Sequence, residues 1–318
     1  MTADSKRSKK RAIGIALGSG SARGWAHIGV LQALTDAGVE PDIVCGSSVG
    51  ALVGAVYVRS HLNSFSDWVR ELNLIEIVRY MDIRLDEGGG FFQGKRFMEF
   101  LKQHIGDIHI EKLPKAFASV ATDLSTGREI WFRTGPLLDA IRASMALPGI
   151  FTPVEFDGQW LVDGGLVNPV PVSLSRAMGA RVVIAVNLNG DILGKHLRKT
   201  APPSVNGKQA SAETWLLEKL SSSLKKHAPS FKGKSKKPVK WRPGLFDVLA
   251  SSLNIMQDRI TRSRMAGDPP NITLSPRLSH IGLLEFDRAA EAIEEGRACV
   301  ERMLPALKDA VDAGLAGY

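Results

Sequence analysis

The sequence contains very few cysteines. Of its 318 residues only Cys45 and Cys299 are cysteine, and they do not form the CxxC spacing typical of a metal site. Two cysteines cannot build a disulfide framework, and no acidic loop has the ligand spacing of a calcium site. We therefore expect a protein of a reducing, cytosolic compartment that needs neither a metal nor another cofactor.

Long apolar runs are also missing. The longest uncharged run, from about Val49 to Val58, is well short of the ~20 residues that span a bilayer. The apolar stretch Ala12–Leu17 is too short for the hydrophobic part of a signal peptide. We expect a cytoplasmic protein without a membrane-spanning segment, one that can still lie on the inner face of a membrane.

Basic residues are plentiful but unevenly distributed. Residues 195–242 hold thirteen Lys or Arg against Glu213 and Glu218, a net charge of +11, and residues 1–11 carry +4. Because the whole chain carries only +8, the remainder has −7. We predict a basic tail at 1–11 and a single domain at 12–318, which has a mildly acidic body and contains a basic, mobile insertion at about 190–243.

The first half of the chain alternates strand and helix patterns. Ala12–Leu17 is a short buried strand, residues 23–37 have a helical period that ends at Gly38, Asp42–Cys45 is a second strand, and Val49–Arg59 a second helix. This order indicates a mostly parallel central sheet with helices on both faces, a three-layer α/β/α fold.

Further elements are expected along the rest of the chain. Residues 61–115 are mainly helical around a Gly88-Gly89-Gly90 loop, and Asp157-Gly158 is a hairpin turn. The other expected strands are 116–121, 128–132, 150–156, 159–162, 181–187 and 271–274. The other expected helices are 136–145, 211–226, 245–265 and 286–312, the last kinked at Pro305.

A GxSxG motif lies between the second strand and the second helix. It reads Gly46-Ser47-Ser48-Val49-Gly50, and only Ser48 has a glycine two residues before and after it. Small neighbours allow a sharp turn that presents the serine oxygen at a helix N-terminus, where negative charge is favoured. We predict Ser48 as a nucleophile, with Gly46, Val49 and Gly50 forming its elbow.

A glycine-rich loop follows the first strand. It reads Gly18-Ser19-Gly20-Ser21-Ala22-Arg23-Gly24 and leads into a helix. A dinucleotide-binding GxGxxG would need glycine where Arg23 stands and an acidic residue after the second strand. The loop fits better as an oxyanion hole, one strand away from Ser48. Arg23 fits either anion binding or the bonding of loop carbonyls.

Two aspartates are candidates for a partner of the serine. Asp163-Gly164-Gly165 directly follows a hairpin strand, where backbone and substrate can approach closely. Taken alone, Asp163 also fits an ordinary turn. Asp123 is either a second active-site carboxylate or the residue that holds the turn ending at Gly127 through an Asx bond.

Together these motifs resemble the patatin-like phospholipases, and within them the bacterial members similar to the catalytic domain of neuropathy target esterase. The resemblance runs from Ile13 to about Asn187 and resumes weakly from 245. It rests on the loop ending Ala22-Arg23-Gly24 with 26–31 after it, on Gly46–Gly50, on 121–123, on 143–151, and on Asp163–Gly165 with Asn168-Pro169 and Pro171.

The resemblance implies a patatin-like fold and a Ser–Asp dyad. Ser48 attacks the acyl carbonyl, Asp163 accepts its proton, and the loop from Gly18 to Gly24 holds the oxyanion. An aspartate has a reference pKa of about 3.9, so burial or hydrogen bonding must tune it as a base. Family patterns usually have three glycines before Ala-Arg-Gly. Here Ser19 and Ser21 replace two of them, at a cost of about 1 kcal/mol if those positions need positive φ.

A Ser–Asp–His triad is the alternative to the dyad. It would need a histidine after Asp163, and the candidates are His196, His227 and His280. The first two lie in the basic insertion, and His280 has no supporting motif. His27 lies in a helical pattern and is more typical of a packed structural residue, so the dyad is favoured.

The predicted function is a carboxylic ester hydrolase acting on lipid acyl esters, similar to a phospholipase A or lysophospholipase. The alternative is a catalytically weak patatin-like scaffold that regulates or binds membranes, and an acyltransferase or thioesterase would share the acyl-enzyme. The basic insertion fits an anionic membrane surface, nucleic acid or a solvated linker. Its aromatics are sparse, which makes nucleic acid the weaker partner.

Overall fold

A computed structural model of the chain describes residues 12–82, 92–191 and 245–316. The predicted tail, the Gly88–Gly90 loop, the helix at 211–226 and almost all of the insertion lie outside these residues. The strands are β1 (Ile13–Leu17), β2 (Ile43–Ser47), β3 (Ala116–Asp123), β4 (Glu129–Phe132), β5 (Val154–Phe156), β6 (Gln159–Asp163), β7 (Val182–Val186) and β8 (Ile272–Leu274).

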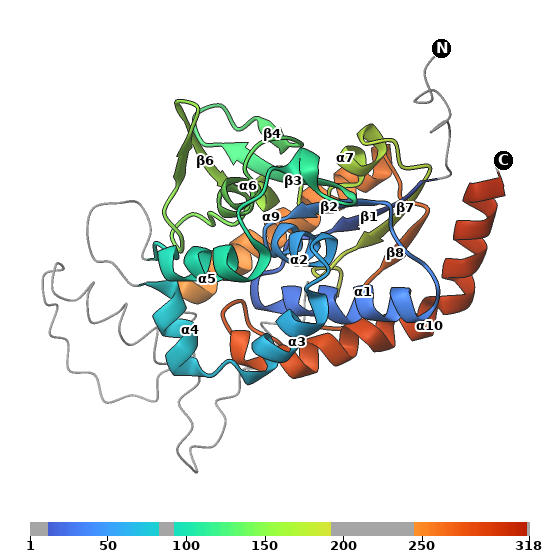
Figure 1. Cartoon of the computed structure of the whole chain (residues 1–318), viewed down its shortest axis with the longest axis horizontal. Coiled ribbons are helices and arrows are strands. Elements are labelled where there is room, and N and C mark those ends of the chain that lie inside the picture. Colours follow the sequence, from blue (N-terminus) through green and yellow to red (C-terminus); the bar gives the residue numbers. More distant parts are fainter. Residues whose placement is uncertain (1–11, 83–91, 192–244, 317–318) are drawn as a thin grey trace, which may run out of the picture.

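Single helices or groups of helices separate most of these strands along the chain (Figure 1). They are α1 (Ala26–Asp36), α2 (Val49–Val58), α3 (Leu62–Glu71), α4 (Leu74–Met81), α5 (Lys95–Ile105), α6 (Leu137–Ser144), α7 (Val172–Ala177), α9 (Leu245–Gly267) and α10 (Ala289–Ala316). Short 3-10 turns occur at Ser21–Trp25, Ile110–Lys112, Gly164–Leu166 and Phe286–Arg288. Helix α10 contains Pro305 and bends along its length (Figure 1).

The strands form one sheet in the order β5-β6-β3-β2-β1-β7-β8, with β4 paired to β3. Strands β3, β2, β1, β7 and β8 pair in parallel, whereas β4, β5 and β6 make antiparallel pairs at one end. Parallel neighbours require crossover connections, and these are the helices between them. The mostly parallel sheet predicted from the sequence is confirmed.

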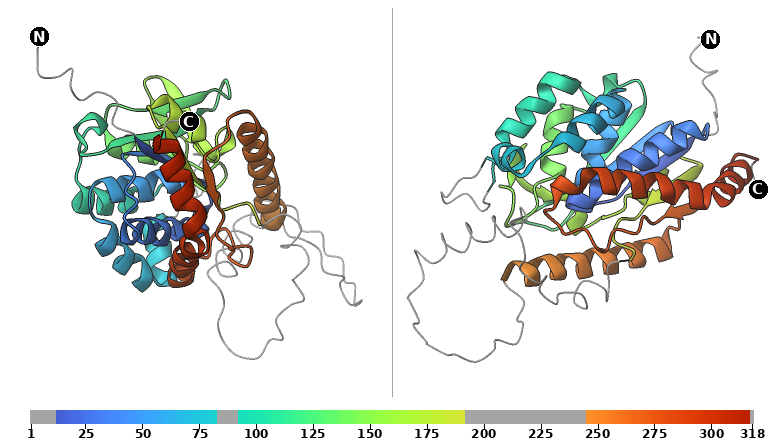
Figure 2. Two further views of the ribbon diagram at one scale, coloured as in Figure 1. Left: turned by 90° about the vertical axis from the view of Figure 1, so that its right-hand side faces the viewer. Right: turned by 90° about the horizontal axis from the view of Figure 1, so that it is seen from below.

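Two apolar cores cover the two faces of this sheet. Successive side chains of a strand point to opposite faces, so Ile15 and Leu17 join the larger core while Ala16 joins the smaller one. The larger core packs against α1, α2, α3, α6 and α10, and the smaller against α7 with Met265 of α9. Figure 2 shows α9 on the side of the sheet opposite α1 and α10. The predicted three-layer α/β/α fold is therefore confirmed.

Several predicted boundaries shift for local reasons. The helix expected from Arg23 begins as the 3-10 turn Ser21–Trp25 and becomes α-helical only at Ala26. The strand expected from Ile150 begins at Val154, because the amides of Ile150 and Phe151 bond to Leu147 O in a turn.

Other boundaries match the sequence pattern closely. Gly38 ends α1 with φ of 77°, as predicted. The hairpin turn is confirmed by Asp157 and Gly158, whose φ values are 49° and 75°.

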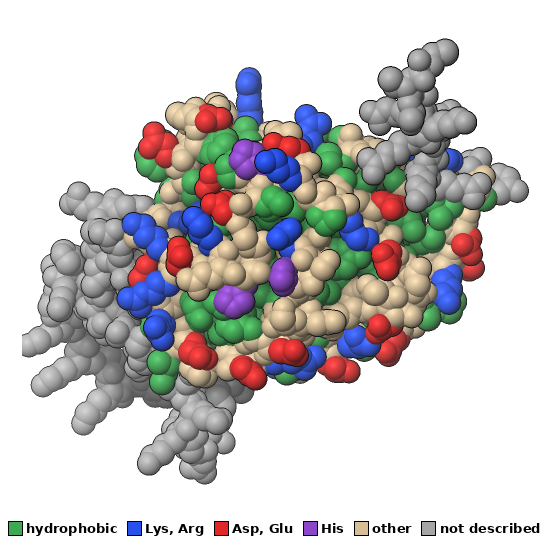
Figure 3. Space-filling view, in the orientation of Figure 1, with side chains coloured by type: hydrophobic (Ala, Val, Ile, Leu, Met, Phe, Trp, Pro, Cys, Tyr) green, Lys and Arg blue, Asp and Glu red, His purple; other side chains and the backbone are tan. Residues whose placement is uncertain are grey.

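Charged side chains of both signs are interspersed on the face shown in Figure 3. Over the described residues, none of the helices is both long enough and apolar enough to cross a bilayer.

Candidate functional site

Ser48 occupies the sharp turn between β2 and α2, as predicted. Its backbone has φ of 56° and ψ of −127°, a conformation outside the usual regions for a residue with a side chain. The turn is tight, since a Cβ on Gly50 would lie 2.2 Å from Leu17 O. A Cβ on Gly46 would lie 2.4 Å from the backbone of α2. Glycine at these two positions lets the turn form and leaves Ser48 at the helix N-terminus.

Strand β3 brings the predicted serine and aspartate together. Its residue Val120 pairs with Ser47, the last residue of β2, and the next residue, Ala121, pairs with Asp163 at the end of β6. Strands β2 and β6 therefore pair with the same edge of β3, and the pairing with β6 begins where the pairing with β2 ends. As a result the Oγ of Ser48 donates a hydrogen bond of 2.5 Å to Oδ2 of Asp163.

Asp163 is buried, with 1% of its surface exposed. Burial raises the pKa of its carboxyl from 3.8 to about 6, and hydrogen bonds from Ser48 and from the amide of Gly165 oppose this rise. The Gly165 amide donates to Oδ1 at 2.7 Å. The neighbouring Gly164 must lack a side chain, because a Cβ there would lie 2.2 Å from Val120 O. Such a carboxylate has a pKa much better suited to a general base than an exposed aspartate.

The glycine-rich loop lies beside Ser48. A Cβ on Gly24 would be 2.2 Å from a methyl group of Val49, so the loop packs directly on the start of α2. Four amides of the loop donate to backbone carbonyls, namely Gly18 to Val186, Ser19 to Pro169, Ala22 to Leu283, and Arg23 to Gly20. Within the described residues, the amides of Gly20 and Ser21 make no such bond. These two amides are the best candidates for oxyanion donors.

The two serines that depart from the family pattern differ in backbone conformation. Ser21 has φ of 51°, in the left-handed region that favours glycine, whereas Ser19 does not have a positive φ. The strain expected from the sequence is thus confined to Ser21. The hydroxyl of Ser19 is buried and has no hydrogen-bond partner among the described residues.

Arg23 stabilises the loop. Its Nε donates to Gly20 O at 3.3 Å, and its Nη2 donates to Oδ1 of Asn254 on α9 at 2.9 Å. The side chain is fully buried, and burial lowers its pKa to about 10 although Asp191 raises it. Of the two roles left open by the sequence, the bonding of loop carbonyls is the one these contacts support.

His27 is a buried structural residue in α1. Its Nε2 lies 2.7 Å from Gly18 O, an acceptor, so this nitrogen carries the proton. Burial lowers the pKa of the imidazole to about 4. The ring is therefore neutral near pH 7 and anchors the start of the glycine-rich loop.

Asp123 closes the turn between β3 and β4. Its Oδ1 accepts from the amide of Ser125 at 2.8 Å, from the Ser125 hydroxyl at 2.7 Å and from the amide of Thr126 at 3.3 Å. The amide of Gly127 donates to Asp123 O at 2.8 Å. These bonds are those of the Asx turn that the sequence suggested, and Asp123 does not line the cavity at Ser48.

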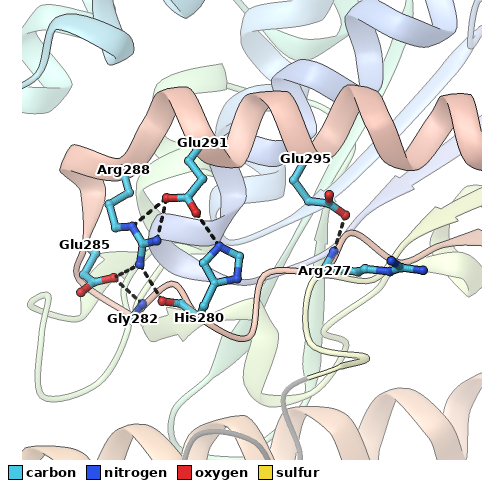
Figure 4. A network of polar contacts seen from close by, with 7 residues as sticks. All are labelled: Arg277, His280, Gly282, Glu285, Arg288, Glu291 and Glu295. Atoms are coloured by element: carbon cyan, nitrogen blue, oxygen red, sulfur yellow. Dashed lines mark hydrogen bonds and ion pairs between the residues drawn. The ribbon is translucent and has the colours of Figure 1, made fainter. Parts of the chain in front are cut away.

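His280 bonds to a glutamate and not to Ser48 or Asp163. Its Nε2 lies 2.7 Å from Oε1 of Glu291, in a network with Arg288 and Glu285 at the start of α10 (Figure 4). It is not among the residues around the cavity at Ser48. The other histidines considered for a triad, His196 and His227, lie outside the described residues.

An apolar cavity opens at Ser48 and Asp163. One wall is the loop residues Ser19, Gly20 and Ser21. The helices expected to line it contribute Trp68 from α3, Leu72 just after α3, Ile77 and Tyr80 from α4, Phe97 from α5, and Leu253 and Gln257 from α9. Residues between α-helices also line the cavity, among them Met145, Leu147, Ile150, Phe151, Leu283 and Phe286. An apolar cavity of this kind suits an acyl chain.

Three contacts at the site were not predicted from the sequence. Ser144 Oγ accepts from the amide of Ser48 at 2.9 Å. Thr122 Oγ1 donates to Asp163 O at 2.8 Å, and Gln257 of α9 lines the cavity. Ser144 and Thr122 lie in segments 143–151 and 121–123, which carry the family resemblance. This resemblance was the sequence signal that could have pointed to the first two contacts. In the described part of the chain, no cluster of three or more His, Cys, Asp or Glu could hold a metal ion.

The chain is similar in sequence to known proteins over much of its length. An uncharacterized NTE family protein of Mycobacterium tuberculosis is 33% identical over 93% of this chain and 92% of its own length. The patatin-like phospholipase domain-containing protein 6 of Mus musculus is 34% identical over 55% of this chain and 13% of its own. VipD from Legionella pneumophila aligns with 93% of this chain and 67% of its own at 12% identity, with a TM-score of 0.44. The patatin-like phospholipase family model matches residues 15–175, and the chain therefore belongs to this family of lipid acyl hydrolases.

Proposed function

We propose that this chain is a carboxylic ester hydrolase that cleaves acyl esters of phospholipids or lysophospholipids through an acyl-enzyme on Ser48. The observation that carries the proposal is the 2.5 Å hydrogen bond from Ser48 Oγ to the buried carboxylate of Asp163. A nucleophile within hydrogen-bond reach of its base is the arrangement that covalent catalysis requires.

In the acylation step, Ser48 Oγ forms a bond to the ester carbonyl carbon and its proton passes to Oδ2 of Asp163. The bond to the leaving alcohol then breaks, and Asp163 returns the proton to that alcohol oxygen. In deacylation, water attacks the acyl-enzyme, Asp163 accepts a proton from the water and passes it to Ser48 Oγ, and the fatty acid leaves. No histidine takes part in either step.

The free amides of Gly20 and Ser21 support an oxyanion hole. Both residues line the same cavity as Ser48, so their N–H groups are available to the negative oxygen of the tetrahedral intermediate. The other five residues of the predicted loop, Gly18, Ser19, Ala22, Arg23 and Gly24, then hold this backbone in place through the bonds and packing described above. Preorganised donors of this kind stabilise charge that develops in the transition state.

The apolar walls of the cavity support a lipid substrate. The acyl chain would lie among Trp68, Leu72 and Ile77 on one side and Leu253 on the other, with its ester at Ser48. The net charge of +11 on residues 195–242 would attract the protein to anionic lipids at the cytoplasmic membrane face.

Hydrolysis assays test the proposal. The substrates are a lysophospholipid, a diacyl phospholipid and p-nitrophenyl esters, and the enzymes are wild type, Ser48→Ala, Asp163→Asn and His280→Asn. We expect activity in wild type and His280→Asn and its loss in the other two. If wild type hydrolyses none of the substrates, the strained Ser21 backbone points to the catalytically weak scaffold instead.

A further inference from the structure

The turn that follows α6 contacts both members of the Ser48–Asp163 pair. Ser144, the last residue of α6, accepts a hydrogen bond of 2.9 Å from the amide of Ser48 through its hydroxyl. Two residues later, the carbonyl of Ala146 accepts a hydrogen bond of 2.9 Å from the amide of Asp163. A segment of three residues thus connects the turn after β2 with the end of β6, at the two positions that meet in the site.

The amide of Ser48 needs a partner from outside its own helix. Ser48 is the N-cap of α2, where the carbonyl accepts from Ala51 and Leu52 but the amide has no acceptor within the helix. The backbone φ of Ser48 is 56°, outside the values of regular helices and strands. Such a conformation persists only when surrounding contacts fix it, and the buried hydroxyl of Ser144 is the contact that fixes the amide.

The position of Ser144 is itself well defined. Ser144 is fully buried, so its hydroxyl cannot exchange this bond for one with solvent. The turn after it is closed by bonds from Met145 to Ile141 O at 3.0 Å and from Leu147 to Met145 O at 2.8 Å. The acceptor for Ser48 therefore belongs to a buried helix end that its own backbone hydrogen bonds hold in place.

We propose that Ser144 is a positioning residue for catalysis, which holds the backbone of Ser48 so that its Oγ stays directed at Asp163. This inference rests on the proposed function, because it assigns Ser144 a role in that reaction. Ser144 touches no reacting atom. Its loss should lower kcat and the rate of attack on an activated probe while leaving KM nearly unchanged, since its side chain does not line the acyl cavity.

Ser144→Ala tests the proposal, with Ser119→Ala as a matched control. Ser119 of β3 is also a fully buried serine. Its hydroxyl donates at 3.4 Å to Ala140 O of α6, the helix that ends at Ser144, and not to Ser48 or Asp163. The measurements are kcat and KM for a p-nitrophenyl ester and the rate of fluorophosphonate labelling. We expect Ser144→Ala to lose about 10- to 100-fold in kcat and labelling rate, and Ser119→Ala to stay within about twofold.

Two further variants complete the test. Ser144→Thr keeps a hydroxyl and should recover most of the rate. If Ser144→Ala is too unstable to purify, Ser144→Cys replaces it, because a thiol is of similar size but a weak acceptor, and the same loss is expected. The inference is overturned if wild type is labelled and Ser144→Ala or Ser144→Cys reacts as fast, or if Ser119→Ala loses as much. A wild type that is never labelled would instead overturn the proposed function.

Discussion

Ser48 and Asp163 are separated by 115 residues of sequence, yet their side-chain oxygens lie 2.5 Å apart. Strand β3 explains this closeness, because its consecutive residues Val120 and Ala121 pair with Ser47 and Asp163. Asp163 is thus the last residue of a strand of the central sheet, and Ser48 lies in the turn that directly joins another strand to a helix. Sites built on regular elements hold their geometry more accurately than sites on loops.

The activity should depend on pH through Asp163. Its pKa is raised to about 6 by burial, and a general base must be deprotonated to accept a proton. We expect kcat/KM to rise tenfold per pH unit below about pH 6 and to level off above it. The measurement is the pH profile of p-nitrophenyl ester hydrolysis. A profile that stays flat down to pH 4.5 would contradict Asp163 as the base.

The same pKa predicts the effect of Asp163→Asn on stability. The folded pKa of about 6 exceeds the ordinary aspartate value of 3.8, so the folded protein binds this proton more readily than the unfolded chain. The stability contributed by the neutral carboxyl is complete below about pH 3.8 and is lost as the pH rises through 6. We expect Asp163→Asn to be more stable than wild type by about 2 to 3 kcal/mol at pH 8.

Denaturant unfolding of both proteins at pH 8 and at pH 4 measures this difference, which should nearly vanish at pH 4. His27 acts in the opposite sense, because its pKa is lowered to about 4 and its stabilisation is lost as the pH falls from about 6.5. Both proteins contain His27, so their difference isolates Asp163. An asparagine variant that is less stable at pH 8 would show that the carboxylate is not desolvated in the folded state.

Ser21→Gly should relieve backbone strain in the glycine-rich loop. Ser21 has φ of 51°, where glycine avoids a cost of about 1 kcal/mol. We expect a rise in the free energy of unfolding of up to about 1 kcal/mol and an unchanged or higher kcat. Ser21→Ala is the control, since it removes the hydroxyl but keeps the Cβ. Equal stability of the glycine and alanine variants would argue against strain at this position.

Filling the cavity should change the acyl-chain preference. Leu253 of α9 lines the cavity, whereas Leu249 on the same helix is exposed. We expect Leu253→Trp to lower kcat/KM for long-chain p-nitrophenyl esters about tenfold and to spare short-chain esters. Leu249→Trp should change neither. If both chain lengths are affected equally by Leu253→Trp, the acyl chain does not extend toward α9.

The local features of the site could be predicted from the sequence because each depends on a few adjacent residues. The turn at Ser48 requires the glycines at 46 and 50, and the hairpin before Asp163 is specified by Asp157-Gly158. The family resemblance that these motifs carry then implied Asp163 as the partner of Ser48. The order of the motifs also identified the family.

Contacts between distant segments could not be predicted in the same way. Arg23 bonds to Asn254, 231 residues later, and no local pattern marks that pairing. Likewise, the sequence gives no sign that β6 extends the edge of β3 beyond β2, because strand order is decided by packing of the whole sheet. The contact of Ser144 with Ser48 could not be predicted for the same reason, since it requires the end of one helix to reach the turn before another.

Fluorophosphonate labelling followed by peptide mapping tests the Ser48–Asp163 dyad most directly, because the probe reacts only with an activated serine. Wild type and His280→Asn should be modified at Ser48 at equal rates. Ser48→Ala should not be modified, and Asp163→Asn should react at least about 100-fold more slowly. Modification at another serine, or equal labelling of Asp163→Asn and wild type, would contradict the dyad.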